Sequence, residues 1–252
     1  MFALLLTMAL APDAPPPARL TPVSAAAPAQ GSLALGVEIA SLLNNADSTS
    51  RQMVKLFDET MPSTLAANPD LAALEAEYPG IIKRMIEAMR PEVERQVIGG
   101  LPVLWDRMAA VYASAMTDAE MREMLAFYRS PTGQWLIESI GEGADLSKLM
   151  TNLLENENAS ITSSDLNAVV ADSVERDLKR TMTKERERDI LRMYASPVGR
   201  KITALNPRLL EIGAAWSNES TPEEDARLSE IVEGVVAEFM NASEDKTSRQ
   251  SS

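Results

Sequence analysis

The stretch FYRSPTGQWL, residues 127–136, decides the fold because a second version of it, MYASPVGRKI, occupies residues 193–202. Extended to 116–137 and 182–203, the two segments share Met, Thr, Arg, Leu, Tyr, Ser, Pro and Gly at matching positions, 66 residues apart. Turn-forming residues are among the matches, so chance is a poor explanation. The sequence therefore predicts one supersecondary unit that occurs twice.

The residue types of this motif are those of a helix–corner–helix. A serine oxygen can cap the second helix by accepting an otherwise unpaired N–H. The proline after it suits the first helical position and disfavours a helical conformation for the serine, which ends the first helix. The glycine admits a close neighbour, and we expect the tyrosine ring to lie against it. The predicted corner residues are Tyr128, Ser130, Pro131 and Gly133, and in the second copy Tyr194, Ser196, Pro197 and Gly199.

Apolar residues keep helical spacing from residue 33 onward, most clearly over 81–116. Pro91, the pair Gly99-Gly100 and Pro102 interrupt that stretch, so we expect kinks or a break there.

Helix start signals recur along the chain. Asn68 before Pro69 predicts a capped start, and Thr117 with Glu120 has the spacing of a capping box. Thr221-Pro222 followed by two glutamates predicts a helix from there to about Met240.

These signals, together with the lack of alternating β-branched runs, predict an all-α fold: a helical bundle over residues 30–242 with no β-sheet. Two related helix–corner–helix units are expected at about 105–155 and 172–216. The polar segment 243–252 is expected to be a disordered tail.

Composition excludes several classes of function. Twenty-four Lys and Arg against 37 Asp and Glu give a net charge of −13, which disfavours binding to nucleic acid or to anionic membrane surfaces. The chain has no Cys and no His, so disulfides, thiol nucleophiles, Ser-His-Asp catalysis and His-ligated metals are excluded. No catalytic residue, metal ligand or cofactor-binding residue is predicted, and an enzyme is disfavoured.

Residues 1–29 are predicted to contain a signal peptide. The apolar run MFALLLTMALA has the length of a signal-peptide core and is too short to span a bilayer. Ala9-Leu10-Ala11 and Ala27-Pro28-Ala29 both suit a signal peptidase, although no Lys or Arg precedes the apolar run. We expect a periplasmic or secreted protein without a membrane span in the mature chain; the alternative is a cytoplasmic protein with an Ala/Pro-rich arm.

The pattern T-x-x-E-M-x-x-M-L-x-F-Y-x-S-P-T-G-Q resembles the signature of a bacterial exported family called domain of unknown function 2059. The resemblance is strongest over 105–155, and 172–216 looks like a diverged second copy in which Arg186, Met193 and Arg200 replace Glu, Phe and Gln. The resemblance implies an all-helical fold, usually behind a signal peptide, and brings no catalytic residues.

Two kinds of ligand site were weighed against packing roles. Arg129, Ser130 and Thr132 could bind an anion at the start of a helix, but capping already explains the serine. Methionine thioethers could hold Cu(I), yet methionine at helical spacing usually fills a core. The methionines concerned are Met85, Met89, Met116, Met121 and Met124.

Aromatic residues gather around the two corners, where buried packing is the ordinary role and a partner groove the alternative. We therefore expect a non-catalytic protein that works through protein–protein interaction or self-association, with a homodimer possible. The alternatives are a histidine-free hydrolase that uses carboxylate, Ser or Tyr groups, and a carrier of a small apolar ligand or metal.

Overall fold

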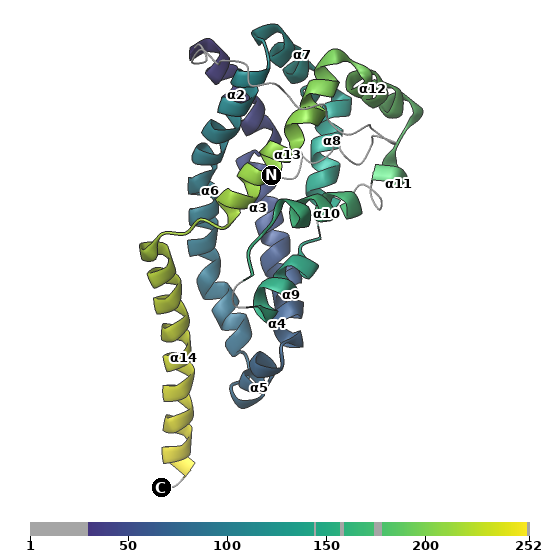
Figure 1. Ribbon diagram of the computed structural model, residues 1–252. Helices are drawn as coiled ribbons and strands as arrows, with labels where there is room; N and C mark the ends of the chain where they lie inside the picture. The colour runs from purple at the N-terminus through teal and green to yellow at the C-terminus, as the bar shows by residue number, and fades with distance from the viewer. Residues whose placement is uncertain (1–29, 144, 157–158, 174–177, 251–252) are drawn as a thin grey trace. The chain divides into compact units, whose positions relative to one another are not determined.

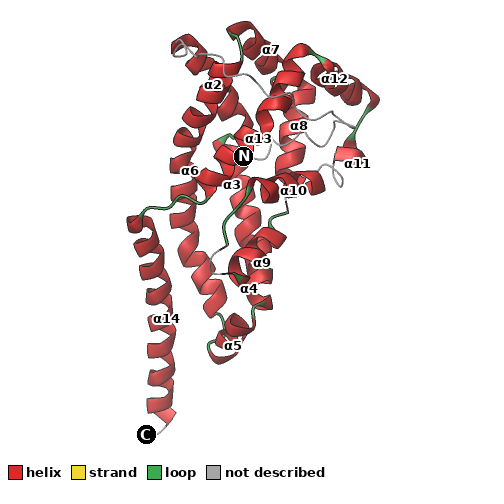
Figure 2. Ribbon diagram, viewed as in Figure 1, coloured by secondary structure: helices red, strands yellow, loops and turns green. Residues whose placement is uncertain are grey.

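The computed structural model describes residues 30–143, 145–156, 159–173 and 178–250. The described residues form helices and connecting turns, with no strand among them (Figures 1 and 2). The all-α prediction is thereby confirmed for this part of the chain. The predicted signal peptide lies outside the described residues. In chain order the helices are α2 (Gln30–Leu43), α3 (Ala46–Lys55), the π-helix η2 (Leu56–Thr60), α4 (Met61–Ala67), α5 (Pro69–Glu77), α6 (Ile81–Ala115), α7 (Asp118–Tyr128), α8 (Pro131–Gly143), α9 (Ser147–Glu155), α10 (Ser163–Ser173), α11 (Lys179–Thr181), α12 (Lys184–Ala195), α13 (Pro197–Ser217) and α14 (Pro222–Gln250).

The helices divide into two compact units, and each unit is made of three separate stretches of chain. The first unit contains the described residues up to Gln52 together with Gly100–Asp145 and Ser160–Asn218. The second contains Met53–Gly99, Leu146–Ala159 and the chain from Glu219 onward. Both predicted corners belong to the first unit.

Close helix packing holds the first unit together. Gly36 in α2 faces Ala109 in α6 so closely that a Cβ on the glycine would lie 2.8 Å from Ala109 Cα. Ile39, Leu104 and Met108 are buried in the same core. Because the glycine removes the side chain at this contact, the two helix backbones can approach each other directly.

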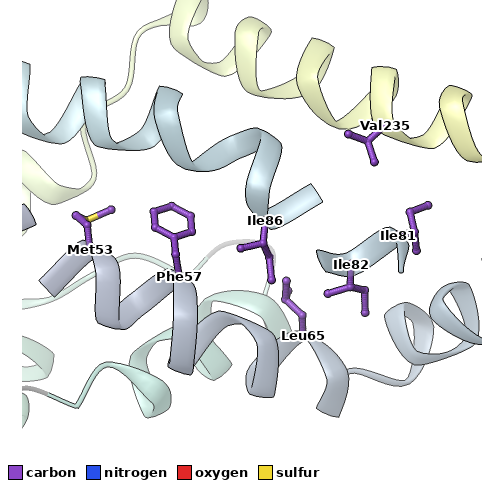
Figure 3. Close-up of a cluster of buried hydrophobic side chains, with 7 residues drawn as sticks. All are labelled: Met53, Phe57, Leu65, Ile81, Ile82, Ile86 and Val235. Atoms are coloured by element: carbon purple, nitrogen blue, oxygen red, sulfur yellow. The ribbon is translucent and has the colours of Figure 1, made fainter. Parts of the chain in front are cut away.

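The second unit has its own apolar core, shown in Figure 3. Phe57 from η2, Leu65 from α4 and Ile86 from α6 are buried together, and Val235 brings α14 onto the same cluster. Each of these side chains is at most 8% exposed. Burial of large aliphatic and aromatic side chains contributes roughly 1.5–3 kcal/mol each, which accounts for the attachment of a helix as polar as α14.

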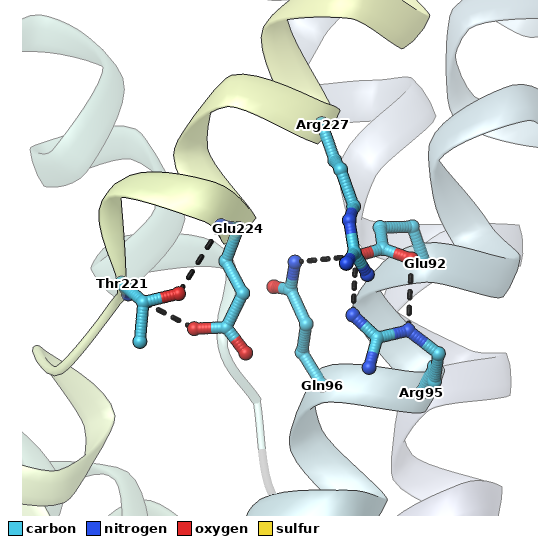
Figure 4. Close-up of polar contacts among 6 residues, drawn as sticks. All are labelled: Glu92, Arg95, Gln96, Thr221, Glu224 and Arg227. Carbon is cyan, nitrogen blue, oxygen red and sulfur yellow. Dashed lines mark hydrogen bonds and ion pairs between the residues drawn. The ribbon is translucent and has the colours of Figure 1, made fainter.

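Polar contacts also join α14 to the first part of α6 (Figure 4). Glu92 accepts hydrogen bonds from Arg95 at 2.6 and 2.9 Å and from Gln96 at 2.9 Å, and Arg227 of α14 lies 3.8 Å from the same carboxylate. The hydrogen bonds from Arg95 and Gln96 lower the pKa of Glu92 to about 2. This carboxylate is therefore ionised throughout the ordinary pH range.

The predicted helix starts are confirmed. Asn68 Oδ1 accepts the backbone N–H groups of Asp70 and Leu71 at the start of α5. Thr117 and Glu120 form the full capping box of α7, and Thr221 and Glu224 exchange the corresponding hydrogen bonds at the start of α14. Local sequence chemistry therefore located these ends correctly.

Two expectations need correction. The chain from Ile81 to Ala115 forms one helix, so no break falls at Pro91 or Pro102; the glycine pair instead marks the boundary between the two units. Helix α14 runs ten residues past Met240 to Gln250, so the backbone of 243–250 is helical where a disordered tail was expected. Polar sequence composition indicated exposure there, and a helix with an exposed surface satisfies the same composition.

No described helix is long and apolar enough to cross a membrane.

Candidate functional site: the two helical corners

Both corners have the geometry that their residue types predict. Ser130 Oγ accepts the Gly133 N–H at 3.1 Å, and Ser196 Oγ accepts the Gly199 N–H at 3.0 Å. Helices α8 and α13 begin at the prolines that follow the two serines. The serine oxygens thus satisfy donors that a helix start would otherwise leave unpaired.

The glycines serve a different contact from the one expected. A Cβ on Gly133 would lie 2.2 Å from Phe127 O and 2.5 Å from Tyr128 Cα, and a Cβ on Gly199 would meet Met193 O and Tyr194 Cα at the same two distances. The backbone of the preceding helix, and not the tyrosine ring, fills the space beside each glycine. Any side chain here would force the corner open.

The tyrosine rings meet each other instead. The hydroxyl oxygens of Tyr128 and Tyr194 are 3.1 Å apart and share a hydrogen bond. Tyr128 is 2% exposed, whereas the ring of Tyr194 is half-buried. Burial of the hydroxyl raises the pKa of Tyr128 to about 12 and raises that of Tyr194 well above its usual value. Both hydroxyls are therefore neutral at physiological pH.

Further contacts link the two corners in a crosswise manner. Lys201 of α13 donates to Glu120 of α7 at 2.8 Å. The guanidinium carbon of Arg186 in α12 lies 4.3 Å above the ring centroid of Trp135 in α8. Positions 120 and 186 are 66 apart in the chain, as are 135 and 201. The same two positions of the motif therefore meet in both directions, once as an ion pair and once as a cation–π contact.

The polar groups that could have bound an anion are engaged within the protein. Thr132 Oγ1 donates to Asp189 Oδ2 at 3.0 Å, and the Arg129 guanidinium pairs with Glu38 of α2. Ser130 is occupied as a cap. The structure thus brings Arg129, Ser130 and Thr132 to one corner but gives each a separate internal partner, which favours the packing role over the anion site.

Two substitutions in the second corner keep a related role. Gln134 donates its amide N–H to Tyr128 O at 2.6 Å, and Arg200, its counterpart, donates to Ala195 O at 2.7 Å. Both side chains satisfy a carbonyl at the end of the preceding helix, which has no partner within that helix. The arginine therefore substitutes for the glutamine as a second hydrogen bond across the corner.

A shallow depression of about 460 Å³ lies beside the first corner. Helices α2 and α3 line one side of it, and Arg129, Gln134 and Glu138 line the other. Charged and amide side chains dominate the lining, so the depression does not suit the small apolar ligand that the sequence left open.

The methionines considered as copper ligands are core residues. Met121 and Met124 are fully buried, and Met116 is 6% exposed. Among the described residues, no group of three or more carboxylates converges as a metal site would require.

The aromatic residues near the corners fill the same interior. Trp105 donates its indole N–H to Asn44 O at 3.0 Å, and Trp216 donates to Gly100 O at 3.2 Å. A Cβ on Gly100 would lie 3.2 Å from the Trp216 ring, so this glycine makes room for the indole. Tyr112 is completely buried, and its hydroxyl has no hydrogen-bond partner in the part of the chain that the structure describes.

Sequence reasoning missed the crosswise contacts of Glu120 with Lys201 and of Arg186 with Trp135. The signal that could have found them is their spacing: each residue is 66 positions from the residue that makes the opposite contact. Two copies of one motif that face each other must exchange such contacts in both directions.

Comparison with known families supports part of this picture. The family described as "Uncharacterized protein conserved in bacteria (DUF2059)" matches residues 104–142, from the last part of α6 through the first corner and most of α8. The matched stretch is shorter than the 105–155 expected from the motif. Neither the curated proteins nor the solved structures gave a match to this chain.

Proposed function

We propose that residues of about 105–155 and 172–216 are two copies of one unit, and that the copies pair about a local two-fold axis at the tyrosine hydroxyls. The support is the crosswise exchange: α7 contacts α13 while α12 contacts α8, and Tyr128 meets its own counterpart Tyr194. Self-contact of equivalent residues is the property that defines a two-fold interface between identical partners.

From this pairing we infer that the corner is a helix-association module and that the protein acts through protein–protein contacts without catalysis. The observation that carries the proposal is the Tyr128–Tyr194 hydrogen bond, because it assigns the most distinctive residues of the motif to an interface. The family match covers the same corner, so its signature residues are accounted for by association.

Catalysis by the corner residues has less support. A tyrosine nucleophile or base needs a pKa near the working pH, but burial raises the pKa of Tyr128 to about 12. The serines are occupied as caps, and Glu120, whose pKa is lowered by Lys201 and the Thr117 backbone, is engaged in the capping box. None of these groups has the free, tuned character of an acid–base catalyst.

We place this activity in the periplasm or outside the cell. The support is the signal-like composition of residues 1–29, together with the start of α2 at Gln30, directly after Ala27-Pro28-Ala29. A helix that begins immediately after a cleavage sequence leaves that sequence accessible to a peptidase.

Affinity capture from an envelope extract tests the proposal. The purified chain, immobilised at its C-terminus, is expected to retain specific envelope proteins or further copies of itself. The matched control is the Gly133→Ala chain, in which the corner is forced open. Equal retention by both chains, or retention of nothing by the native chain at any concentration, would show that the corner is not an association module.

A further inference from the structure

Helices α7 and α12 occupy equivalent positions in the two corners but differ in what covers them. Helix α2 packs on α7, where Ser32 donates to Asp118 at 2.6 Å and Glu38 pairs with Arg129. Leu125 beneath it is only 4% exposed. At the equivalent position of α12, Leu191 is 56% exposed. The helix-covered face of the first corner is thus uncovered in the second.

The exposed face of α12 around Leu191 has a defined chemistry. One turn before Leu191 lie Glu187 and Arg188, and one turn after it lie Tyr194 and Ala195. Within the described residues, neither Glu187 nor Arg188 has a hydrogen-bond or ion-pair partner. The ring of Tyr194 remains partly accessible although its hydroxyl is bonded to Tyr128. The patch therefore combines an apolar centre with an unpaired cation and an aromatic ring.

Charge favours a second copy of this chain as the occupant. The whole chain carries −13, so most surfaces of two copies repel each other. Helix α12 is an exception, because it has four cations and three carboxylates. Two copies that meet through α12 avoid the repulsion that the rest of the acidic surface imposes.

Spacing within α12 also fits a two-fold contact. If two α12 helices cross antiparallel with Leu191 on the axis, the residue three before it faces the residue three after it in the other copy. That arrangement sets Arg188 of each copy against the Tyr194 ring of the other, a cation–π pairing of the kind that Arg186 and Trp135 already make. The small Ala195 side chain allows the two helices to approach closely.

We infer that the α12 face centred on Leu191 is a docking surface for a second copy of this chain, so that the protein forms a two-fold dimer through α12. This inference rests on the proposed association function and names its partner and surface. One leucine and one cation–π pair per copy make a small interface, so the dimer is concentration-dependent.

Sedimentation equilibrium of the full chain over a wide concentration range tests the inference. The native chain is expected to shift from monomer to dimer, and Leu191→Asp is expected to weaken the dimer by at least about tenfold, since it removes two buried leucines and adds like charges. The matched control is Val54→Asp, which alters a 48% exposed side chain in the second unit and is expected to leave association unchanged. Circular dichroism verifies that both variants keep their helix content.

A second variant, Arg188→Ala, separates the cation–π contact from the apolar one and is expected to weaken the dimer less than Leu191→Asp does. A strictly monomeric native chain would overturn the inference, as would a dimer that survives Leu191→Asp. Neither result touches the proposed function if envelope proteins are still captured through an intact corner. Failure of the capture experiment in a chain that does dimerise through α12 would instead remove the role of the corner.

Discussion

Gly133 and Gly199 are the residues at which a single added methyl group has the largest consequence. Each faces the backbone of the preceding helix at distances that no Cβ can share. Gly234 in α14, by contrast, has nothing within 4 Å of the position that a Cβ would take. The same substitution therefore acts through opposite mechanisms at these sites: overlap at the corner and reduced backbone entropy in the exposed helix.

Gly133→Ala is expected to lower the free energy of unfolding by about 3 kcal/mol or more, because Phe127 O would lie 2.2 Å from the new methyl group. Gly234→Ala is expected to raise it by about 0.5–1 kcal/mol, as alanine does in a helix interior. Urea unfolding followed by circular dichroism measures both. Equal effects of the two substitutions would contradict the close backbone contact at the corner.

The three buried tyrosines allow a second test at this scale. Tyr128→Phe leaves the Tyr194 hydroxyl without its partner and is expected to cost about 1–2 kcal/mol, whereas Tyr112→Phe removes a hydroxyl that has no described partner and is expected to be neutral or stabilising. The Tyr128→Phe/Tyr194→Phe double variant should cost less than the sum of the single ones. Additive costs would mean that the hydroxyl pair contributes no coupling.

The same hydroxyls set a pH limit on stability. Burial raises the folded-state pKa of Tyr128 to about 12, above the value of about 10 for an unfolded tyrosine. The neutral form is favoured in the folded state, so this contribution is fully present below about pH 10 and is lost as the pH rises through 12.

At the scale of elements, the crosswise contacts decide how α7–α8 and α12–α13 pair. Lys201 and the Thr117 backbone lower the pKa of Glu120, so the carboxylate stabilises the folded state above its unfolded pKa and this contribution is lost as the pH falls below it. Arg186 occupies the equivalent position in the second corner and uses a cation–π contact, which does not titrate in this range. Acid should therefore weaken one side of the pairing more than the other.

Glu120→Gln is expected to lower stability at pH 7 by up to about 1 kcal/mol and to have a smaller effect at pH 3, where the native carboxylate is partly protonated. Urea unfolding of both chains at the two pH values measures the difference. Glu230→Gln in α14, where the native side chain is exposed, serves as the control. An effect of Glu120→Gln that is the same at both pH values would exclude the ion pair as its cause.

On the scale of the whole molecule, the division into two units explains why no single hydrophobic centre dominates the chain. The corners and α2 belong to one unit, whereas α14 and the first part of α6 enclose the core around Phe57 and Val235 in the other. The proposed export concerns the segment before both units, since the first described helix starts at Gln30.

If residues 1–29 direct export with cleavage after Ala29, the mature protein recovered from the periplasm or the medium begins at Gln30. N-terminal sequencing of that protein, with its mass, tests the expectation. Replacing Ala29 with Asp blocks the small-residue site and should leave a longer, uncleaved chain. Recovery of the full-length native chain from the cytoplasm alone would refute both the cleavage and the location.

The sequence by itself determined the all-α class, the capped helix starts at Asn68, Thr117 and Thr221, and the two serine-capped corners. These features depend on interactions between residues a few positions apart, so local chemistry suffices to predict them. Only the tertiary structure decided where the tyrosine rings point, which backbone fills the space beside Gly133, and why Leu125 is covered while Leu191 is exposed. Those outcomes depend on contacts between residues far apart in the chain, and such contacts exist only once the helices have packed.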